Sequence, residues 1–137
     1  MKVVWLGIVS MVVLIGAMSA SYADNPNDGI VAVGGETVLV LRAAVGNMSI
    51  RQRANDVQDR LVTILSAPKL GMADIVKVKL PDGEYRINVH HKLLVTVTKE
   101  DAAVNKTTTS KLARIWTEKL RKVLPELNAR PNPNNEK

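Results

Sequence analysis

The feature that most constrains the fold is a pair of short segments, residues 75–80 and 84–89, in which apolar and polar side chains alternate. Between them stands Pro81-Asp82-Gly83, a turn signal because proline presets φ and glycine accepts a positive φ. The sequence therefore predicts an antiparallel hairpin with one face on a core and the other in water. The alternation assigns Val76, Val78 and Leu80 to the core side and Lys77 and Lys79 to the water side.

Two longer segments show the periodicity of amphipathic helices. The first begins after Ser49, which can form a capping box with Gln52, and ends at Pro68. The second begins after the possible capping residues 107–110 and ends at Pro125. The predicted core stripes are Ile50, Ala54, Val57, Leu61, Ile64 and Leu65 in the first helix, and Leu112, Ile115, Trp116, Leu120, Val123 and Leu124 in the second.

The remaining apolar segments complete one α+β domain over residues 36–125. Residues 36–44 are apolar on both faces, which favours a central strand, and residues 93–98 form a further strand rich in β-branched side chains. The element order β-α-β-β-β-α predicts a two-layer sandwich, with two helices on one face of a four-stranded mixed sheet. We expect residues 24–35 to be a flexible lead-in and residues 126–137 to be a disordered tail.

Residues 1–23 have the layout of a secretory signal peptide. Lys2 supplies the positive charge, an apolar run follows, and Ser21-Tyr22-Ala23 precedes the expected cut before Asp24. The alternative is an uncut segment that anchors the chain in the inner membrane. In both cases the rest of the chain is exported, and the absence of cysteine favours a bacterial periplasm over a disulfide-rich secreted domain.

The chain is basic, with 19 lysines and arginines against 13 acidic residues and a net charge of +6. For an exported protein this excludes nucleic acid as the expected partner and favours an anionic lipid surface or envelope polymer. An ordinary solvated surface is the other interpretation, because no basic run is long enough for a dedicated polyanion site. The candidate contacts lie on the polar face of the last helix and are Lys111, Arg114, Arg121 and Lys122.

No set of residues has the spacing of a catalytic or cofactor site, so we expect a protein that is not an enzyme and binds no cofactor. His90-His91 is the only hint of a metal, and a zinc site needs three or four ligands. Asp56 and Asp59 are interpreted as surface carboxylates, with Asp56 able to pair with Arg60 one turn later. The sequence therefore predicts neither a metal site nor a carboxylate dyad.

An ordered set of short motifs resembles a known family. Gly35-Glu36, Arg53-Ala54, Arg60-Leu61, Thr98-x-x-Asp101-Ala102 and Leu112-Ala113-x-x-Trp116 follow the order of the extracytoplasmic N-terminal domain of some bacterial mechanosensitive channels of the small-conductance type. Those channels continue into transmembrane helices, whereas no hydrophobic segment follows here, so the resemblance implies a free-standing accessory domain that conducts no ions.

The resemblance singles out Arg53, Arg60 and Asp101, for which two roles stay open. They either fix a helix to a strand end or a carboxylate, or they contact a partner. The function predicted from the sequence is a non-enzymatic interaction or accessory module of the cell envelope, whose partner is an envelope protein or a second copy of the chain. The alternative is binding of anionic envelope material through the basic face of the last helix.

Overall fold

The computed structural model describes residues 25, 27–67 and 69–129. In this part of the chain the fold is α+β, as predicted, with strands β1 (Ile30–Val33), β2 (Glu36–Val40), β3 (Ile75–Lys79), β4 (Tyr85–Val89) and β5 (Lys92–Val97). The helices are α1 (Ile50–Leu65), α2 (Lys99–Val104) and α3 (Thr109–Ala129), with a 3₁₀ turn at Met72–Asp74. The predicted signal segment, residues 1–23, lies outside the described residues.

The strands form two antiparallel sheets, so the predicted single four-stranded mixed sheet is wrong. One sheet is the hairpin β1-β2 and the other has the order β3-β4-β5. Where the chain beyond β2 comes near β5, a side chain takes the place of backbone pairing, because Arg53 donates to the carbonyl oxygens of both Ala43 and Thr96. Both sheets nevertheless share one apolar core with α1 and α3.

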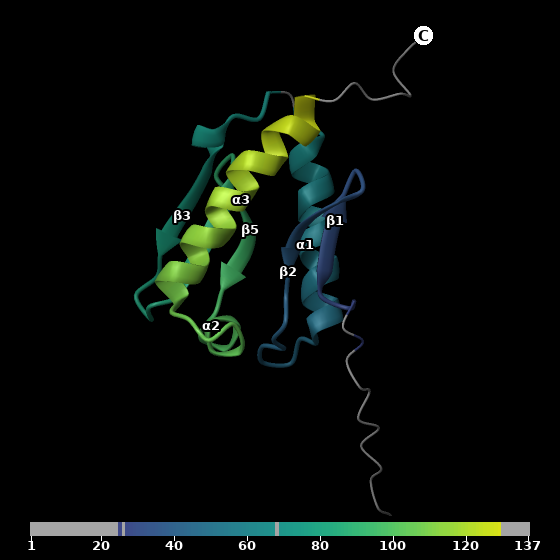
Figure 1. Ribbon diagram of the computed structural model, residues 1–137. Coiled ribbons are helices and arrows are strands. Elements are labelled where there is room, and N and C mark those ends of the chain that lie inside the picture. Colours follow the sequence, from purple (N-terminus) through teal and green to yellow (C-terminus); the bar gives the residue numbers. More distant parts are fainter. Residues whose placement is uncertain (1–24, 26, 68, 130–137) are drawn as a thin grey trace, which may run out of the picture.

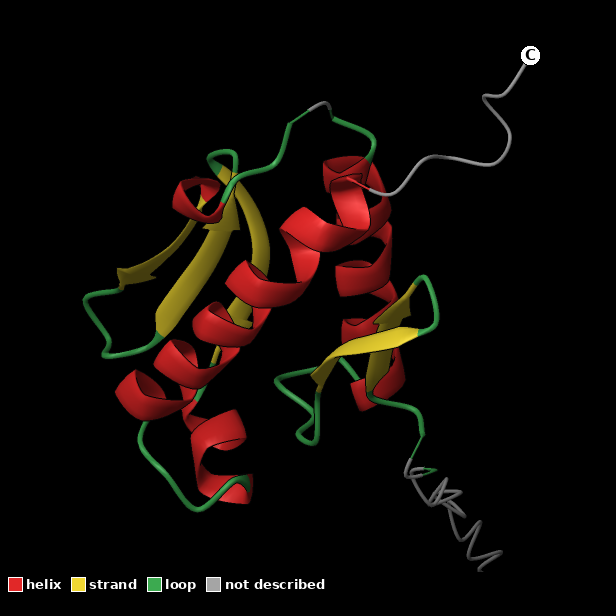
Figure 2. Ribbon diagram, turned by 45° about the horizontal axis from the view of Figure 1, so that its top comes forward, coloured by secondary structure: helices red, strands yellow, loops and turns green. Residues whose placement is uncertain are grey.

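The two long helices do not lie together on one face of a sheet. Helix α3 crosses the three-stranded sheet, whereas α1 packs behind the β1-β2 hairpin (Figure 1). In Figure 2 the two sheets lie to either side of α3. Helix α1 also contacts β5, which places its polar side chains beside the outer edge of that strand. This position of α1 determines the candidate site.

Strand β1 occupies part of the predicted flexible lead-in. It pairs with β2 through the two-residue turn Gly34-Gly35, in which both glycines have positive φ, 58° and 80°. Two residues with positive φ match the right-handed twist of a hairpin, and glycine adopts this conformation without strain. The sequence signal was therefore present, since a glycine pair between two apolar runs is typical of a tight hairpin.

Helix α1 follows the prediction closely. Ser49 Oγ accepts a hydrogen bond from the backbone of Gln52 at 3.2 Å, and the Gln52 side chain accepts one from the backbone of Ser49 at 2.9 Å. This reciprocal pair satisfies two backbone donors that the first turn of a helix leaves open. The predicted stripe is buried at Ala54, Val57, Leu61 and Ile64.

Helix α3 does not end at Pro125 but continues to Ala129, so residues 126–129 of the predicted tail are helical. A proline inside a helix loses one backbone hydrogen bond, and other contacts must offset that loss. Leu124 is fully buried and Leu127 packs against the core. Asn128 accepts a hydrogen bond from the backbone of Leu70 at 2.9 Å and donates to the carbonyls of Leu65 and Ala67 at 3.2 and 3.0 Å.

Replacing Asn128 with alanine is expected to lower the free energy of unfolding by about 1–3 kcal/mol, because half-buried backbone groups at the end of α1 lose their partner. Urea denaturation followed by circular dichroism measures this change. Asn55→Ala, at an exposed position of α1, is the control and should stay within about 0.5 kcal/mol of the parent protein. Equal stability of the two variants would show that the end of α3 does not hold α1.

In the three-stranded sheet, β3 presents the opposite face to the core from the one predicted. Lys77 lies opposite buried Ile87 and Val78 lies opposite exposed Arg86, so the valines of β3 are on the open face. Val76 and Val78 are 38% and 43% exposed. The lysines lie at the outer edge of the core side, where their long stems reach solvent, and Lys77 Nζ is 5.8 Å from the centroid of the Tyr85 ring.

None of the helices in the described part of the chain is long and apolar enough to cross a membrane.

Candidate functional site

Arg53 stands in the first turns of α1 and is almost fully buried, at 8% exposed. Its guanidinium donates to both carboxylate oxygens of Asp101, at 2.8 and 2.7 Å. It also donates to the backbone carbonyls of Ala43 and Thr96. A planar guanidinium suits this bidentate contact with a carboxylate. Through the two carbonyl bonds, Arg53 also joins α1 to β5 and to the β2–α1 loop.

Asp101 is completely buried and is held from two sides. Its Oδ2 atom accepts hydrogen bonds from the Thr98 backbone at 3.0 Å and the Thr98 hydroxyl at 2.9 Å, in addition to Arg53. Thr98 and Asp101 together form the capping box of α2. Buried charges of this kind are stable only when they are paired and hydrogen-bonded. The pair is therefore part of the architecture and joins α1 to the first turn of α2.

Arg60 lies two turns further along α1 and is exposed. Its Nη1 atom donates to the carbonyl oxygen of Leu94 in β5 at 3.2 Å. Arg53 and Arg60 thus cover carbonyl groups along the outer edge of β5, which would otherwise be open to pairing with another strand. The other nitrogen atoms of Arg60 make no hydrogen bond within the described residues, so the side chain keeps donors for a ligand.

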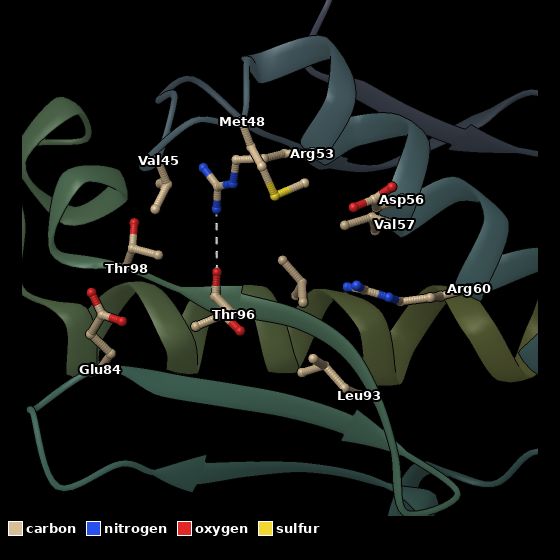
Figure 3. A pocket seen from close by; sticks show the side chains of 11 residues that line it. Val45, Met48, Arg53, Asp56, Val57, Arg60, Glu84, Leu93, Thr96 and Thr98 are labelled. Carbon is tan, nitrogen blue, oxygen red and sulfur yellow. Dashed lines mark hydrogen bonds between the residues drawn. The ribbon is translucent and has the colours of Figure 1, made fainter.

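A cavity of about 290 Å³ lies between α1, the loop before it and β5 (Figure 3). Apolar side chains supply much of its lining and include two buried valines. Met48 reaches into it from the loop and is 39% exposed. The volume is near the lower end of the range of about 300–1,000 Å³ usual for ligand pockets. The lining residues are Val45, Met48, Val57, Leu93 and Val95, with Arg53, Asp56, Arg60, Glu84, Thr96 and Thr98 as the polar members.

Two opposite charges stand on the α1 wall of this cavity. Asp56 and Arg60 are one turn apart, and the spacing predicts an ion pair between them. The structure shows no such pair, and Asp56 makes no hydrogen bond or ion pair with any described residue. Because Asp101 neutralises Arg53, the cavity lining offers two carboxylates, those of Asp56 and Glu84, and the guanidinium of Arg60 over an apolar floor. Such a surface suits a peptide segment that carries both charged and apolar groups.

The two histidines form the turn between β4 and β5. His90 and His91 have positive φ, 49° and 64°, and His90 Nδ1 lies 3.6 Å from Asp74 Oδ1. Neither histidine lines the cavity. In the described part of the chain, no group of three histidine, cysteine, aspartate or glutamate side chains is placed to hold a metal ion.

The predicted basic face of α3 is weaker than the sequence indicates. Lys111, Arg114 and Lys122 are exposed, but Arg114 pairs with Glu118 at 3.2 Å. Arg121 is half-buried, and its Nε atom donates to the carbonyl oxygen of Ile75 at 2.9 Å, so it caps the start of β3. Two of the four predicted cations thus have a partner within the fold, Arg114 in Glu118 and Arg121 in the Ile75 carbonyl.

Sequence reasoning missed the apolar part of the cavity. Met48 and Leu93 carry no motif, and they meet only because the β2–α1 loop folds over the edge of β5. Asp56 was singled out as a surface charge and Arg60 as an anchor or contact. The signal that could have linked them is the position of both on the helix face that also carries Arg53.

Comparison with known proteins gives a family match. No curated protein and no solved structure matches the chain. A family profile described as a domain of unknown function matches residues 30–127, which run from the start of β1 to the last turns of α3. The match includes the Arg53–Asp101 pair and every residue that lines the cavity. The chain therefore belongs to the family described as Domain of unknown function (DUF8459).

Proposed function

We propose that this protein is an exported, non-enzymatic interaction module of the cell envelope, and that it holds a segment of another envelope protein in the cavity between α1 and β5. The observation that carries the proposal is that, among the described residues, Asp56 has no partner and Arg60 donates only to the Leu94 carbonyl, both beside an apolar floor. A charged side chain that keeps a free hydrogen-bonding group next to exposed apolar surface is suited to recognising a partner.

The chemistry of the cavity favours binding over catalysis. Arg53 and Asp101, the most buried charges at the site, already satisfy each other, so neither is poised to transfer a proton. The cavity lining contains no histidine, cysteine, serine or lysine to serve as nucleophile or base. The two carboxylates of the lining have separate positions. Asp56 is on α1, whereas Glu84 is in the turn between β3 and β4 and accepts a hydrogen bond from the backbone amide of Lys99 at 3.1 Å.

The proposed location in the cell envelope is inferred from the sequence alone. Residues 1–23 have the layout of a signal peptide, and the ordered motifs resemble the extracytoplasmic domain of mechanosensitive channels. A domain of that kind would act through contact with another protein, either diffusing in the periplasm or tethered to the inner membrane.

The test is quantitative capture of envelope proteins by the tagged full-length chain from the cells that express it. Arg60→Ala should reduce the captured partner about tenfold, because arginine is a frequent hot spot of protein interfaces. Arg51→Ala is the matched control, since Arg51 is on the same helix, is exposed and pairs with Asp28 away from the cavity. Equal capture by both variants, with parental melting temperatures, would contradict the proposal.

A further inference from the structure

The outer edge of β3 is open, and the hairpin turn fixes which of its backbone groups face outward. The Leu80 amide donates to the Glu84 carbonyl at 2.8 Å and the Gly83 amide donates to the Leu80 carbonyl at 3.1 Å, so Leu80 faces β4. In an antiparallel ladder the facing residues alternate, which turns the backbone groups of Lys77 and Lys79 away from β4. The bond from Arg121 to the Ile75 carbonyl, made from outside the sheet, agrees with this alternation.

Among the described residues, the edges of β1 and β5 carry a cover that the middle of β3 lacks. Gln58 of α1 accepts a hydrogen bond from the Ala32 amide of β1 at 3.2 Å, and two arginines of α1 cover the edge of β5. On β3 the cover ends with Arg121 at Ile75. No described group makes a hydrogen bond to the outward backbone of Lys77 or Lys79. An uncovered pair of residues on an edge strand offers up to four hydrogen-bonding groups to a guest strand.

The side chains of β3 show what kind of strand fits. Val76 and Val78 stand half-exposed on the open face, while Lys77 and Lys79 are exposed on the other face. A second copy of the chain is a poor guest, because two β3 strands paired antiparallel would bring their lysines together, and like charges on opposed strands are destabilising. A guest strand with acidic side chains beside the lysines and apolar side chains beside the valines is complementary on both faces.

We infer that the β3 edge is a second docking site, which binds an extended segment of alternating acidic and apolar residues by adding it as a strand to the β3-β4-β5 sheet. Main-chain hydrogen bonds to Lys77 and Lys79 hold the segment, and the alternating side chains select it. The site lies at the opposite edge of the sheet from β5 and the cavity, so it is independent of the proposed function of that cavity.

The experiment is an NMR titration of the full-length ¹⁵N-labelled chain with a capped peptide of alternating glutamate and valine. Amide signals of β3 should shift, and a reference peptide with lysine in place of glutamate should bind at least about tenfold more weakly. Lys77→Pro should abolish binding without breaking the β3-β4 ladder, because the lost amide hydrogen faces outward. Lys77→Arg, which keeps both the charge and the amide, should bind like the parent protein.

A double charge reversal, Lys77→Glu with Lys79→Glu, covers the case in which the proline variant does not fold. This variant should lose the glutamate–valine peptide and bind the lysine–valine peptide instead. The inference is overturned if the glutamate–valine peptide does not bind, if both peptides bind the parent chain equally, or if the shifts fall on α1 and β5. If the chain itself formed concentration-dependent dimers, with amide shifts confined to β3, the guest strand would be a second copy of the chain and not an acidic and apolar segment.

Discussion

Replacing Asp101 with alanine is expected to lower the free energy of unfolding by about 3–5 kcal/mol, the usual cost of removing one member of a buried ion pair. Arg53 is 8% exposed and would stay buried with a charge that nothing offsets. The amide and hydroxyl of Thr98 would lose their acceptor at the same time. Urea denaturation of the purified chain, followed by circular dichroism, measures the change.

The control for this prediction is a surface pair in the same protein. Glu118→Ala breaks the Arg114–Glu118 contact, whose side chains are 54% and 59% exposed, and should cost about 0.5 kcal/mol or less. The variant Arg53→Met with Asp101→Leu removes both buried charges and should recover much of the stability lost in Asp101→Ala. A loss below about 1 kcal/mol for Asp101→Ala would show that the pair does not hold α1 to α2.

Gly29→Ala is the second change with a large expected effect, a loss of about 3 kcal/mol in the free energy of unfolding. A Cβ atom at this position would lie 1.7 Å from the carbonyl oxygen of Leu41 and 2.9 Å from Cγ2 of Ile50. The backbone cannot move away freely, because the Leu41 amide donates to the Gly29 carbonyl at 2.8 Å. The added methyl group therefore forces the hairpin β1-β2 away from the start of α1.

Gly71→Ala provides the matched control for Gly29→Ala. Its Cβ would meet only the Asp74 carboxylate, at 3.4 Å, and its φ of −105° is accessible to alanine. Thermal and urea denaturation should find this variant within about 0.5 kcal/mol of the parent protein. If the two glycine variants were equally stable, the close packing of residue 29 against residue 41 would be refuted.

The parts of the fold that were predictable depend on local chemistry. The capping box of α1, its buried stripe and the turn at Pro81-Asp82-Gly83 each follow from residues close together in the chain. The α+β class follows from the same local patterns. The division into two sheets does not, because Arg53 there bridges the carbonyls of Ala43 and Thr96, which are far apart in the sequence.

The errors have physical causes of the same kind. In residues 76–79 valine and lysine alternate, so periodicity defines two faces but not which one is buried. Register with Ile87 decides the question, since Ile87 packs under α3 and brings Lys77 to its side. Pro125 was a reasonable helix stop by local rules, but burial of Leu124 and the bonds of Asn128 outweigh one lost backbone bond.

The candidate site was predictable only in its charged residues. Arg53, Arg60 and Asp101 stand in motifs, and the face of α1 that carries the two arginines can be read from the sequence. The apolar floor cannot, because Met48 and Leu93 come together through a loop whose path no local pattern fixes. The sequence also cannot show which charged side chains lack a partner, since the spacing of Asp56 and Arg60 predicts an ion pair that does not form.

The cavity between α1 and β5 is the proposed binding site for a protein partner. The most direct test places the photo-crosslinking amino acid p-benzoylphenylalanine at Met48, in the full-length chain and in the cells that express it. Irradiation should link the chain to one discrete envelope protein, and Arg60→Ala should remove that product. The same probe at Val62, which is 60% exposed and does not line the cavity, should give no such product. Identical products from both positions, or none from Met48, would contradict the account.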